Sequence, residues 1–176
     1  VEQQLTPLEQ AIDSFLTAYY GNNNDEYDND ILVEYWCRQE HLNLEAHADV
    51  DEVLFERSKG RKIQYPTMGH VLYLSRPTIG AGPTCVFECR RNEQSGLICD
   101  EISSVVTSPA VPGRILRFPG CALHAVPKPA DIWLKTSSET SEDDEDDENE
   151  RSVILFNTWE NTEPTGVPQD PIFEDE

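Results

Sequence analysis

The chain has 176 residues, enough for one domain with a substantial core, and its hydrophobic content of 38% is that of a folded globular protein. Thirteen basic residues against 34 acidic ones give a formal net charge of −21, and nine of the acids lie between residues 139 and 150. Such a surface repels nucleic-acid phosphates, which argues against DNA or RNA as a partner and leaves room for a basic protein partner. No apolar run approaches the roughly 20 residues of a transmembrane helix.

The cysteine content indicates a reducing compartment, because five cysteines are an odd number without the dense spacing of a secreted disulfide scaffold. Cys85 and Cys89 have a Cys-x3-Cys spacing, but no second pair or histidine lies nearby. We therefore expect buried strand cysteines and no zinc site. The expected location is therefore the cytoplasm or, because the first residue is Val1 rather than Met, an organelle after removal of a targeting segment.

Residues Leu5–Tyr20 are predicted to form a helix. Thr6 and Glu9 have the spacing of a capping box, Pro7 suits the first helical turn, and apolar residues recur at helical spacing along one face. We expect this helix to pack on a sheet. The turn-forming and charged run at residues 21–30 predicts an exposed loop after it.

From residue 31 onward the apolar residues recur with a period of two, which predicts strands. Glycine and proline separate nearly all of these segments, which favours a sandwich or barrel over βαβ units. The predicted fold class is mainly β with an N-terminal helix. The predicted strands are Ile31–Cys37, Leu42–Asp49, His70–Ser75, Thr84–Cys89, Arg114–Phe118, Ala122–Val126, Ile132–Lys135 and Val153–Trp159.

Two segments stand apart by composition. Residues 137–150 form an acidic, low-complexity insertion between two predicted strands, and a solvated loop is a commoner role for such a run than a specific docking element. Residues 160–176 have no periodicity and read as a C-terminal tail along the surface. The expected organisation is therefore residues 1–30 as helix and loop, residues 31–159 as one β domain, and a tail.

One predicted strand, Leu42–Asp49, carries residues that suit a metal ion. Successive side chains of a strand point to opposite faces, so His47 and Asp49 share one face while Leu42 and Leu44 share the other. Taken alone, this pattern is more often an ordinary half-buried strand with its polar face in water. A metal site therefore needs further ligands elsewhere in the chain.

Two downstream residues supply the rest of a recognisable set. His124 stands in a short apolar strand, and Arg151 opens another apolar strand, where a buried guanidinium needs an anion for its fork of donors. The order His47-x-Asp49, then His124, then Arg151 reproduces a two-histidine, one-carboxylate triad followed by a basic residue. In this order the chain resembles the Fe(II)/2-oxoglutarate-dependent dioxygenases, especially the prolyl-hydroxylase-like branch, over roughly residues 31–159.

Other stretches are similar to the same family. Val71–Ser75 with the following Gly80–Thr84 looks like its tyrosine-bearing strand and Gly-Pro-Thr turn, and Arg114–Phe118 looks like the strand that leads to the distal histidine. The resemblance implies a double-stranded β-helix, or jelly roll.

The resemblance also implies an activity and a set of roles. His47, Asp49 and His124 would bind Fe(II), and Arg151 would hold the distal carboxylate of 2-oxoglutarate with help from the Tyr73 hydroxyl. Such an enzyme hydroxylates a small-molecule or protein side-chain substrate, releases succinate and carbon dioxide, and often uses ascorbate as an accessory reductant.

The chain departs from the family pattern in the 27 positions that separate His124 from Arg151, more than the family usually has. The acidic insertion can absorb this length because loop insertions cost little closure entropy. Arg114 or Arg117 would be the anion binder if Arg151 is not.

The remaining polar residues near the motif are expected to play other roles. His41 lies too far along the strand to join the same ion, and His70 has the opposite parity to Tyr73 and should face away from the pocket. Asp51 and Glu52 follow the motif closely and could contact the metal ligands or the substrate, but a solvated strand end is the commoner role for such residues.

The sequence leaves two other functions open. A non-catalytic subunit could keep the oxygenase fold and dock through its acidic surface, insertion and tail onto a larger assembly, including an organellar one. A cupin-type metal enzyme without a cosubstrate would bind metal whether or not Arg151 is present.

Overall fold

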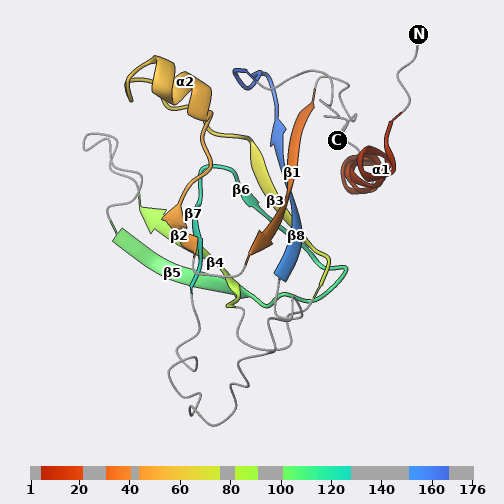
Figure 1. Ribbon diagram of the computed structural model, residues 1–176. Coiled ribbons are helices and arrows are strands. Elements are labelled where there is room, and N and C mark those ends of the chain that lie inside the picture. Colours follow the sequence, from red (N-terminus) through yellow and green to blue (C-terminus); the bar gives the residue numbers. More distant parts are fainter. Residues whose placement is uncertain are drawn as a thin grey trace, which may run out of the picture. The chain divides into compact units, whose positions relative to one another are not determined.

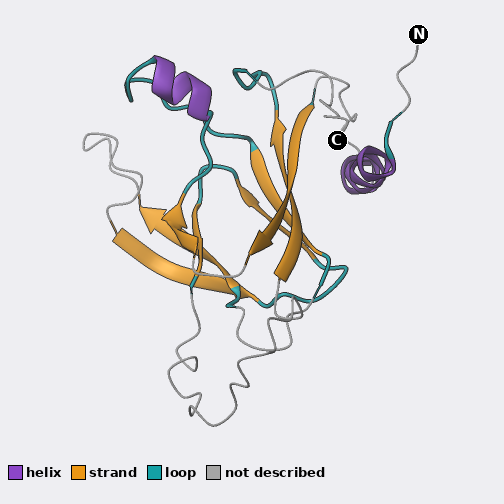
Figure 2. Ribbon diagram, viewed as in Figure 1, coloured by secondary structure: helices purple, strands orange, loops and turns teal. Residues whose placement is uncertain are grey.

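The structure, a computed structural model, describes residues 5–21, 31–40, 44–75, 82–90, 101–127 and 151–166. The chain divides into two compact units, Val1–Ile31 and Leu32–Glu176. The first contains helix α1 (Pro7–Gly21), and the second contains helix α2 (Glu52–Arg57) and all the described strands (Figures 1 and 2). Neither of these described helices is long and apolar enough to cross a membrane.

Helix α1 begins with the predicted capping box. The Thr6 N–H donates to Glu9 Oε2 at 2.6 Å, and the Glu9 N–H donates to Thr6 Oγ1 at 3.3 Å. These two bonds satisfy donors that the first turn of a helix otherwise leaves free, and Pro7 at the first helical position has no N–H to satisfy. The predicted helix is therefore confirmed, with its bounds shifted to Pro7–Gly21.

The described strands form two antiparallel four-stranded sheets. One has the order β1-β8-β3-β6 and the other the order β2-β7-β4-β5. The prediction of a mainly β protein with an N-terminal helix is thus confirmed. The strands of the first sheet are β1 (Leu32–Glu40), β8 (Arg151–Trp159), β3 (Met68–Tyr73) and β6 (Ile115–Pro119), and those of the second are β2 (Leu44–His47), β7 (Leu123–Val126), β4 (Thr84–Arg90) and β5 (Glu101–Ser108).

The two sheets face each other and share a core (Figure 1). Val71 and Tyr73 of β3, Phe118 of β6 and Val153 of β8 are buried together. Val86 of β4, in the opposite sheet, packs against this cluster. Side chains from both sheets therefore meet in the interior between them.

Strand β2 is shorter and less regular than predicted. It spans Leu44–His47, and its pairing with β7 shifts register between those two residues. As a result Leu44 and His47 line the same cavity, whereas Glu45 and Ala46 are exposed. The prediction that Leu44 and His47 lie on opposite faces is wrong, because an irregularity in pairing breaks the alternation of a regular strand.

Asp51 has a structural role that the sequence did not reveal. It is only 4% exposed and caps α2, since Asp51 Oδ1 accepts from the Leu54 N–H at 2.8 Å. Its second oxygen, Oδ2, accepts from the Thr165 N–H at 2.6 Å, which ties the segment after β8 to α2. Burial raises the pKa of this carboxyl, but the backbone hydrogen bonds from Leu54 and Thr165 outweigh that effect and hold the pKa below its usual range. The prediction of a solvated strand end was wrong.

Strand β5 was not predicted. Ile102, Val105 and Val106 do not alternate strictly, and all three are exposed. Among the described strands, β5 lies at the edge of its sheet, next to β4. An edge strand needs no buried face, so it can lack the period of two on which strand prediction depends. The predicted strand Ile132–Lys135 and the acidic insertion lie outside the described residues.

His70 is buried on the face of β3 opposite to Val71 and Tyr73, and it does not line the cavity described below. Its side chain is 2% exposed and stacks on Phe156, with ring centroids 4.3 Å apart and planes 3° apart. The pKa of His70 is lowered to about 4, mainly by burial and to a smaller extent by the nearby Arg117 charge. A hydrogen bond between Nδ1 and the Phe156 carbonyl, 3.2 Å long, opposes this shift only in part.

His70 is expected to make the fold sensitive to acid. Between pH 6.5 and about 4 the unfolded chain takes up a proton at this residue that the folded chain does not, so the free energy of unfolding falls as the pH falls. The two pKa values correspond to a loss of roughly 3 kcal/mol. Urea denaturation at pH 7.5 and pH 4.5 should show that the free energy of unfolding falls less between these pH values in His70→Gln than in the wild type. Equal losses in both proteins would contradict this role.

Candidate metal centre

Pairing between β2 and β7 places two histidines side by side. His47 is the last residue of β2, and the register sets it directly opposite His124 of β7. Opposed residues of neighbouring strands project from the same face. The two imidazole centroids are accordingly 4.3 Å apart.

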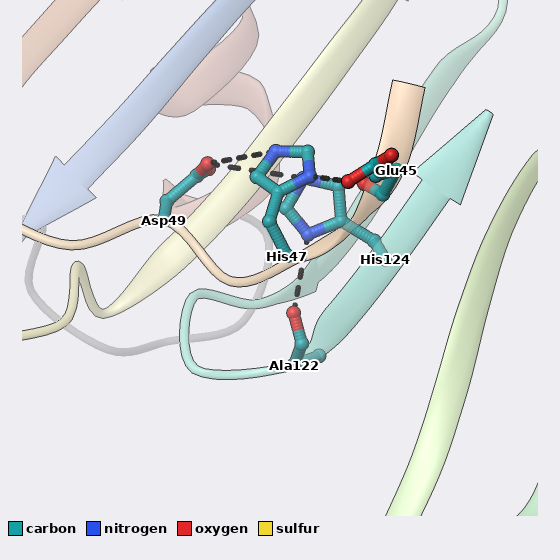
Figure 3. A network of polar contacts seen from close by, with 5 residues as sticks. All are labelled: Glu45, His47, Asp49, Ala122 and His124. Carbon is teal, nitrogen blue, oxygen red and sulfur yellow. Dashed lines mark hydrogen bonds and ion pairs between the residues drawn. The ribbon is translucent and has the colours of Figure 1, made fainter. Parts of the chain in front are cut away.

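Asp49 completes the cluster from outside the strand. It lies two residues beyond the end of β2, in the connection to α2, and its carboxylate points toward both imidazoles (Figure 3). The alternation in Leu42–Asp49 predicted that His47 and Asp49 share the face of one strand. They instead meet because the chain leaves the strand after His47.

The three side chains have the spacing of a metal site. Asp49 Oδ1 lies 3.7 Å from His47 Nε2 and 3.8 Å from His124 Nε2, and all three candidate ligand atoms lie within 4.8 Å of one another. Neighbouring ligands about 2.1 Å from an ion are roughly 3 Å apart in octahedral geometry. Shifts of about 1 Å or less would bring these atoms onto one ion, so the donor set fits a single metal.

Backbone carbonyls orient both imidazoles. His47 Nδ1 lies 2.8 Å from the Glu45 carbonyl oxygen, and His124 Nδ1 lies 3.1 Å from that of Ala122 (Figure 3). A carbonyl can only accept, so each imidazole donates its N–H from Nδ1. The Nε2 lone pairs then point into the cluster, which is the arrangement that metal-binding histidines use.

The cluster is anchored on one side and accessible on the other. The His124 side chain is 7% exposed and packs against the Phe118 ring, with centroids 4.8 Å apart. The Asp49 and His47 side chains are 19% and 37% exposed. An ion or substrate can therefore reach the site past β2.

The triad lines an open cavity of about 680 Å³, to which residues of both sheets contribute. This volume is in the range of small-molecule sites. Four carboxylate residues line it, and no described lining residue is a lysine or arginine. The lining residues are Glu34, Tyr35, Trp36, Leu44, His47, Ala48, Asp49, Val50, Asp51, Glu52, Val53, Val71, Thr84, His124, Val126, Leu155, Asn157, Pro164, Thr165 and Gly166.

Tyr73, a predicted cosubstrate ligand, lies in the core behind this cavity. Its side chain is fully buried, and its hydroxyl donates to Thr84 Oγ1 at 2.8 Å. Thr84 itself lines the cavity. A contact between Tyr73 and a cosubstrate stays a prediction.

The arginines occupy different places. Arg151 is the first residue of β8 and its backbone pairs with Glu40, but its side chain lies outside the described part of the structure. Arg114 is exposed and donates to the Pro109 carbonyl at 3.0 Å, and Arg117 lines a separate cavity of about 420 Å³. Neither Arg114 nor Arg117 lines the metal cavity, so they are poor substitutes for Arg151. His41 lies outside the described residues.

Two polar cavity residues were not identified from the sequence. Glu34 of β1 and Asn157 of β8 stand opposite each other in the pairing of these strands. Their partnership depends on which strands are neighbours, and the pattern of either segment alone carries no such information. Both residues lie within predicted strands. The alternation of side chains could have shown which face of its strand each residue occupies, but not which residue lies opposite it.

Comparison of the chain with models of known protein families found no match, and a search of curated protein sequences found none either.

Proposed function

We propose that the chain is an Fe(II)- and 2-oxoglutarate-dependent oxygenase that hydroxylates its substrate. The observation that carries this proposal is the convergence of His47, Asp49 and His124 at one point in a cavity between two β-sheets. Two imidazoles and one carboxylate that leave further positions open are the donor set of non-haem Fe(II) oxygenases.

The strand order supports a jelly roll of the double-stranded β-helix type. Each sheet combines strands from both halves of the chain, in the orders β1-β8-β3-β6 and β2-β7-β4-β5. Eight antiparallel strands in two facing sheets are the general architecture of jelly rolls. In this arrangement the interior between the sheets is the natural place for a metal centre and its substrates.

The cavity has room for 2-oxoglutarate next to the metal ligands. Val71 and Leu155 offer an apolar wall for the carbon chain, and the Thr84 hydroxyl offers a polar contact. By the resemblance to the dioxygenases, Arg151 and Tyr73 would hold the distal carboxylate. Bound iron would supply the activation of dioxygen, in which 2-oxoglutarate becomes succinate and carbon dioxide and one oxygen atom enters a substrate C–H bond.

The chain's own residues prepare this site. The backbone carbonyls of Glu45 and Ala122 hold the imidazoles so that both Nε2 atoms face Asp49. The Phe118 ring covers one side of His124 and keeps water from it. Ligand orientation is therefore built into β2 and β7.

Succinate formation tests the proposal directly. The protein is incubated with Fe(II), 2-oxoglutarate, oxygen and ascorbate, and succinate is compared between the wild type, Asp49→Ala and Arg151→Ala. We expect slow, substrate-independent turnover in the wild type, none in Asp49→Ala, and a raised KM for 2-oxoglutarate in Arg151→Ala.

Other outcomes separate the alternatives. Metal binding with neither succinate formation nor metal-dependent 2-oxoglutarate binding would favour a cupin-type enzyme without a cosubstrate. Failure to bind any divalent metal would favour a non-catalytic subunit. Either result would refute the oxygenase assignment.

A further inference from the structure

A row of cross-strand neighbours in the sheet β1-β8-β3-β6 begins with two residues that line the cavity, Glu34 and Asn157. Glu34 of β1 pairs with Asn157 of β8, which pairs with Gly69 of β3, which pairs with Phe118 of β6. Directly opposed residues lie roughly 5 Å apart between their Cβ atoms. Glu34 and Asn157 are therefore close enough to contact one small group together.

The Asn157 amide has unused hydrogen-bonding capacity. Its residue is 3% exposed and lines the cavity, and its side chain makes no hydrogen bond among the described residues. Gly69 beside it has no side chain, and the edge of the Phe118 ring occupies the space that a Cβ there would need. Because Asn157 lines the cavity, its amide can form hydrogen bonds with a ligand bound there.

Glu34 is a half-buried carboxylate without a cationic partner in this row. Burial raises the pKa of Glu34, and the approach of the Trp159 indole N–H lowers it less, without completing a hydrogen bond. The carboxylates of Asp49, Asp51 and Glu52 raise it further. A positive charge placed beside Glu34 would stabilise its carboxylate against both burial and the repulsion of the neighbouring carboxylates.

We propose that Glu34 and Asn157 bind a protonated nitrogen of the substrate, an ammonium or guanidinium group, in the cavity that also holds the metal triad. The charge of the cavity favours such a group, because four acidic residues and no described lysine or arginine line it. Trp36, on the same face of β1 as Glu34, adds an aromatic side chain to the lining. The pair accepts hydrogen bonds from the nitrogen through Glu34 and the Asn157 side-chain oxygen.

This inference deepens the proposed function by naming its substrate class, and it rests on that function only in calling the occupant a substrate. Neither Glu34 nor Asn157 is among the candidate metal ligands. Binding of the amine can therefore be measured separately from metal binding and from turnover.

The test uses matched probes that differ in charge. Nα-acetyl-lysine amide is compared with Nα-acetyl-norleucine amide, and Nα-acetyl-arginine amide with Nα-acetyl-citrulline amide. Binding is measured by NMR titration of the full chain with and without Zn(II). Zn(II) stands in for Fe(II) because it supports no redox chemistry. At least one cationic probe should bind tenfold or more tightly than its neutral partner, and the preferred pair tells ammonium from guanidinium.

Two substitutions assign the effect to the pair. Glu34→Gln keeps the shape of the side chain. It should weaken binding of the cationic probe roughly 10- to 100-fold, as expected for the loss of a hydrogen bond to a charged group. Asn157→Leu should weaken it about fivefold, as expected for a neutral hydrogen bond. Glu52→Gln, which removes an exposed carboxylate of the same cavity, should change it less than about twofold.

Folding is checked by thermal unfolding. Because burial makes the Glu34 charge costly, Glu34→Gln should unfold at the same or a higher temperature than the wild type at pH 7.5. If Glu34→Gln and Glu52→Gln lose the same affinity for the cationic probe, the probe is attracted by the overall negative charge of the cavity, and the proposal is overturned. The absence of any preference for the cationic probes would also overturn it. If Zn(II) fails to bind, the oxygenase assignment is refuted. The titration with cationic probes in the absence of metal still tests whether Glu34 and Asn157 bind a protonated nitrogen.

Discussion

Replacing Asp49 with alanine is expected to lower the affinity for Zn(II) or Fe(II) by more than about 100-fold, beyond the range found for the loss of a residue that only supports a ligand. Asp49 Oδ1 lies within 4 Å of both His47 Nε2 and His124 Nε2. Its removal leaves two neutral imidazoles and no carboxylate in the candidate ligand set. His47→Ala and His124→Ala should have comparable effects.

A titration against a chromophoric chelator, anaerobic for Fe(II), measures these affinities. Glu45→Ala is the matched control, because Glu45 is exposed and its contact with His47 comes from its backbone carbonyl. This control should stay within about twofold of the wild type. Wild-type affinity in Asp49→Ala would mean that the ion is held elsewhere.

Replacing Gly120 with alanine is expected to destabilise the fold by about 3 kcal/mol or more. Gly120 is buried in the turn between β6 and β7, and its N–H donates to the Thr67 carbonyl at 3.1 Å. A Cβ at this position would overlap the carbonyl group of Pro66. Two backbone segments would then have to separate, which costs more than the rearrangement of a side chain.

Urea denaturation measures this loss, with Gly113→Ala as the control. Gly113 has a φ of 78° but no heavy atom within 4 Å of the position of an added Cβ. Its substitution therefore carries only backbone strain, about 1 kcal/mol. If the two variants lose the same stability, the close approach of Gly120 to Pro66 is not a strong constraint.

The same variant links the fold to the metal centre. The turn at Gly120 leads directly to Ala122, whose carbonyl oxygen orients His124. We therefore expect folded Gly120→Ala protein to bind metal more weakly than the wild type, whereas folded Gly113→Ala protein should bind it normally.

Local patterns were enough to predict most of the regular elements. The capping box at Thr6 and Glu9 marked the start of α1, and alternation marked the strands that carry His47 and His124. The order of ligands in the chain was enough to single out His47, Asp49 and His124 as one set, and the structure brings these three together.

Features that depend on pairing or on capping were missed. A shift in register puts Leu44 on the face of His47, which strict alternation forbids. Asp51 was read as the end of a strand, although an aspartate just before a helix-forming run is a common N-cap signal that could have revealed α2. The wall formed by Glu34 and Asn157 follows from the pairing of β1 with β8, two segments more than a hundred residues apart.

The position of β2 in its sheet gives the metal a second consequence. In the described part of the chain, β2 is an edge strand of four residues that pairs with β7 through Leu44 and His47. Short edge segments open locally at low free-energy cost, without unfolding of the rest of the protein. An ion bound by both His47 and His124 would crosslink the two strands. Local opening of β2 would therefore become rarer as the metal site fills. Amide hydrogens of β2 would then exchange with solvent slowly in the loaded protein and quickly after chelation, while those of β8 would not respond.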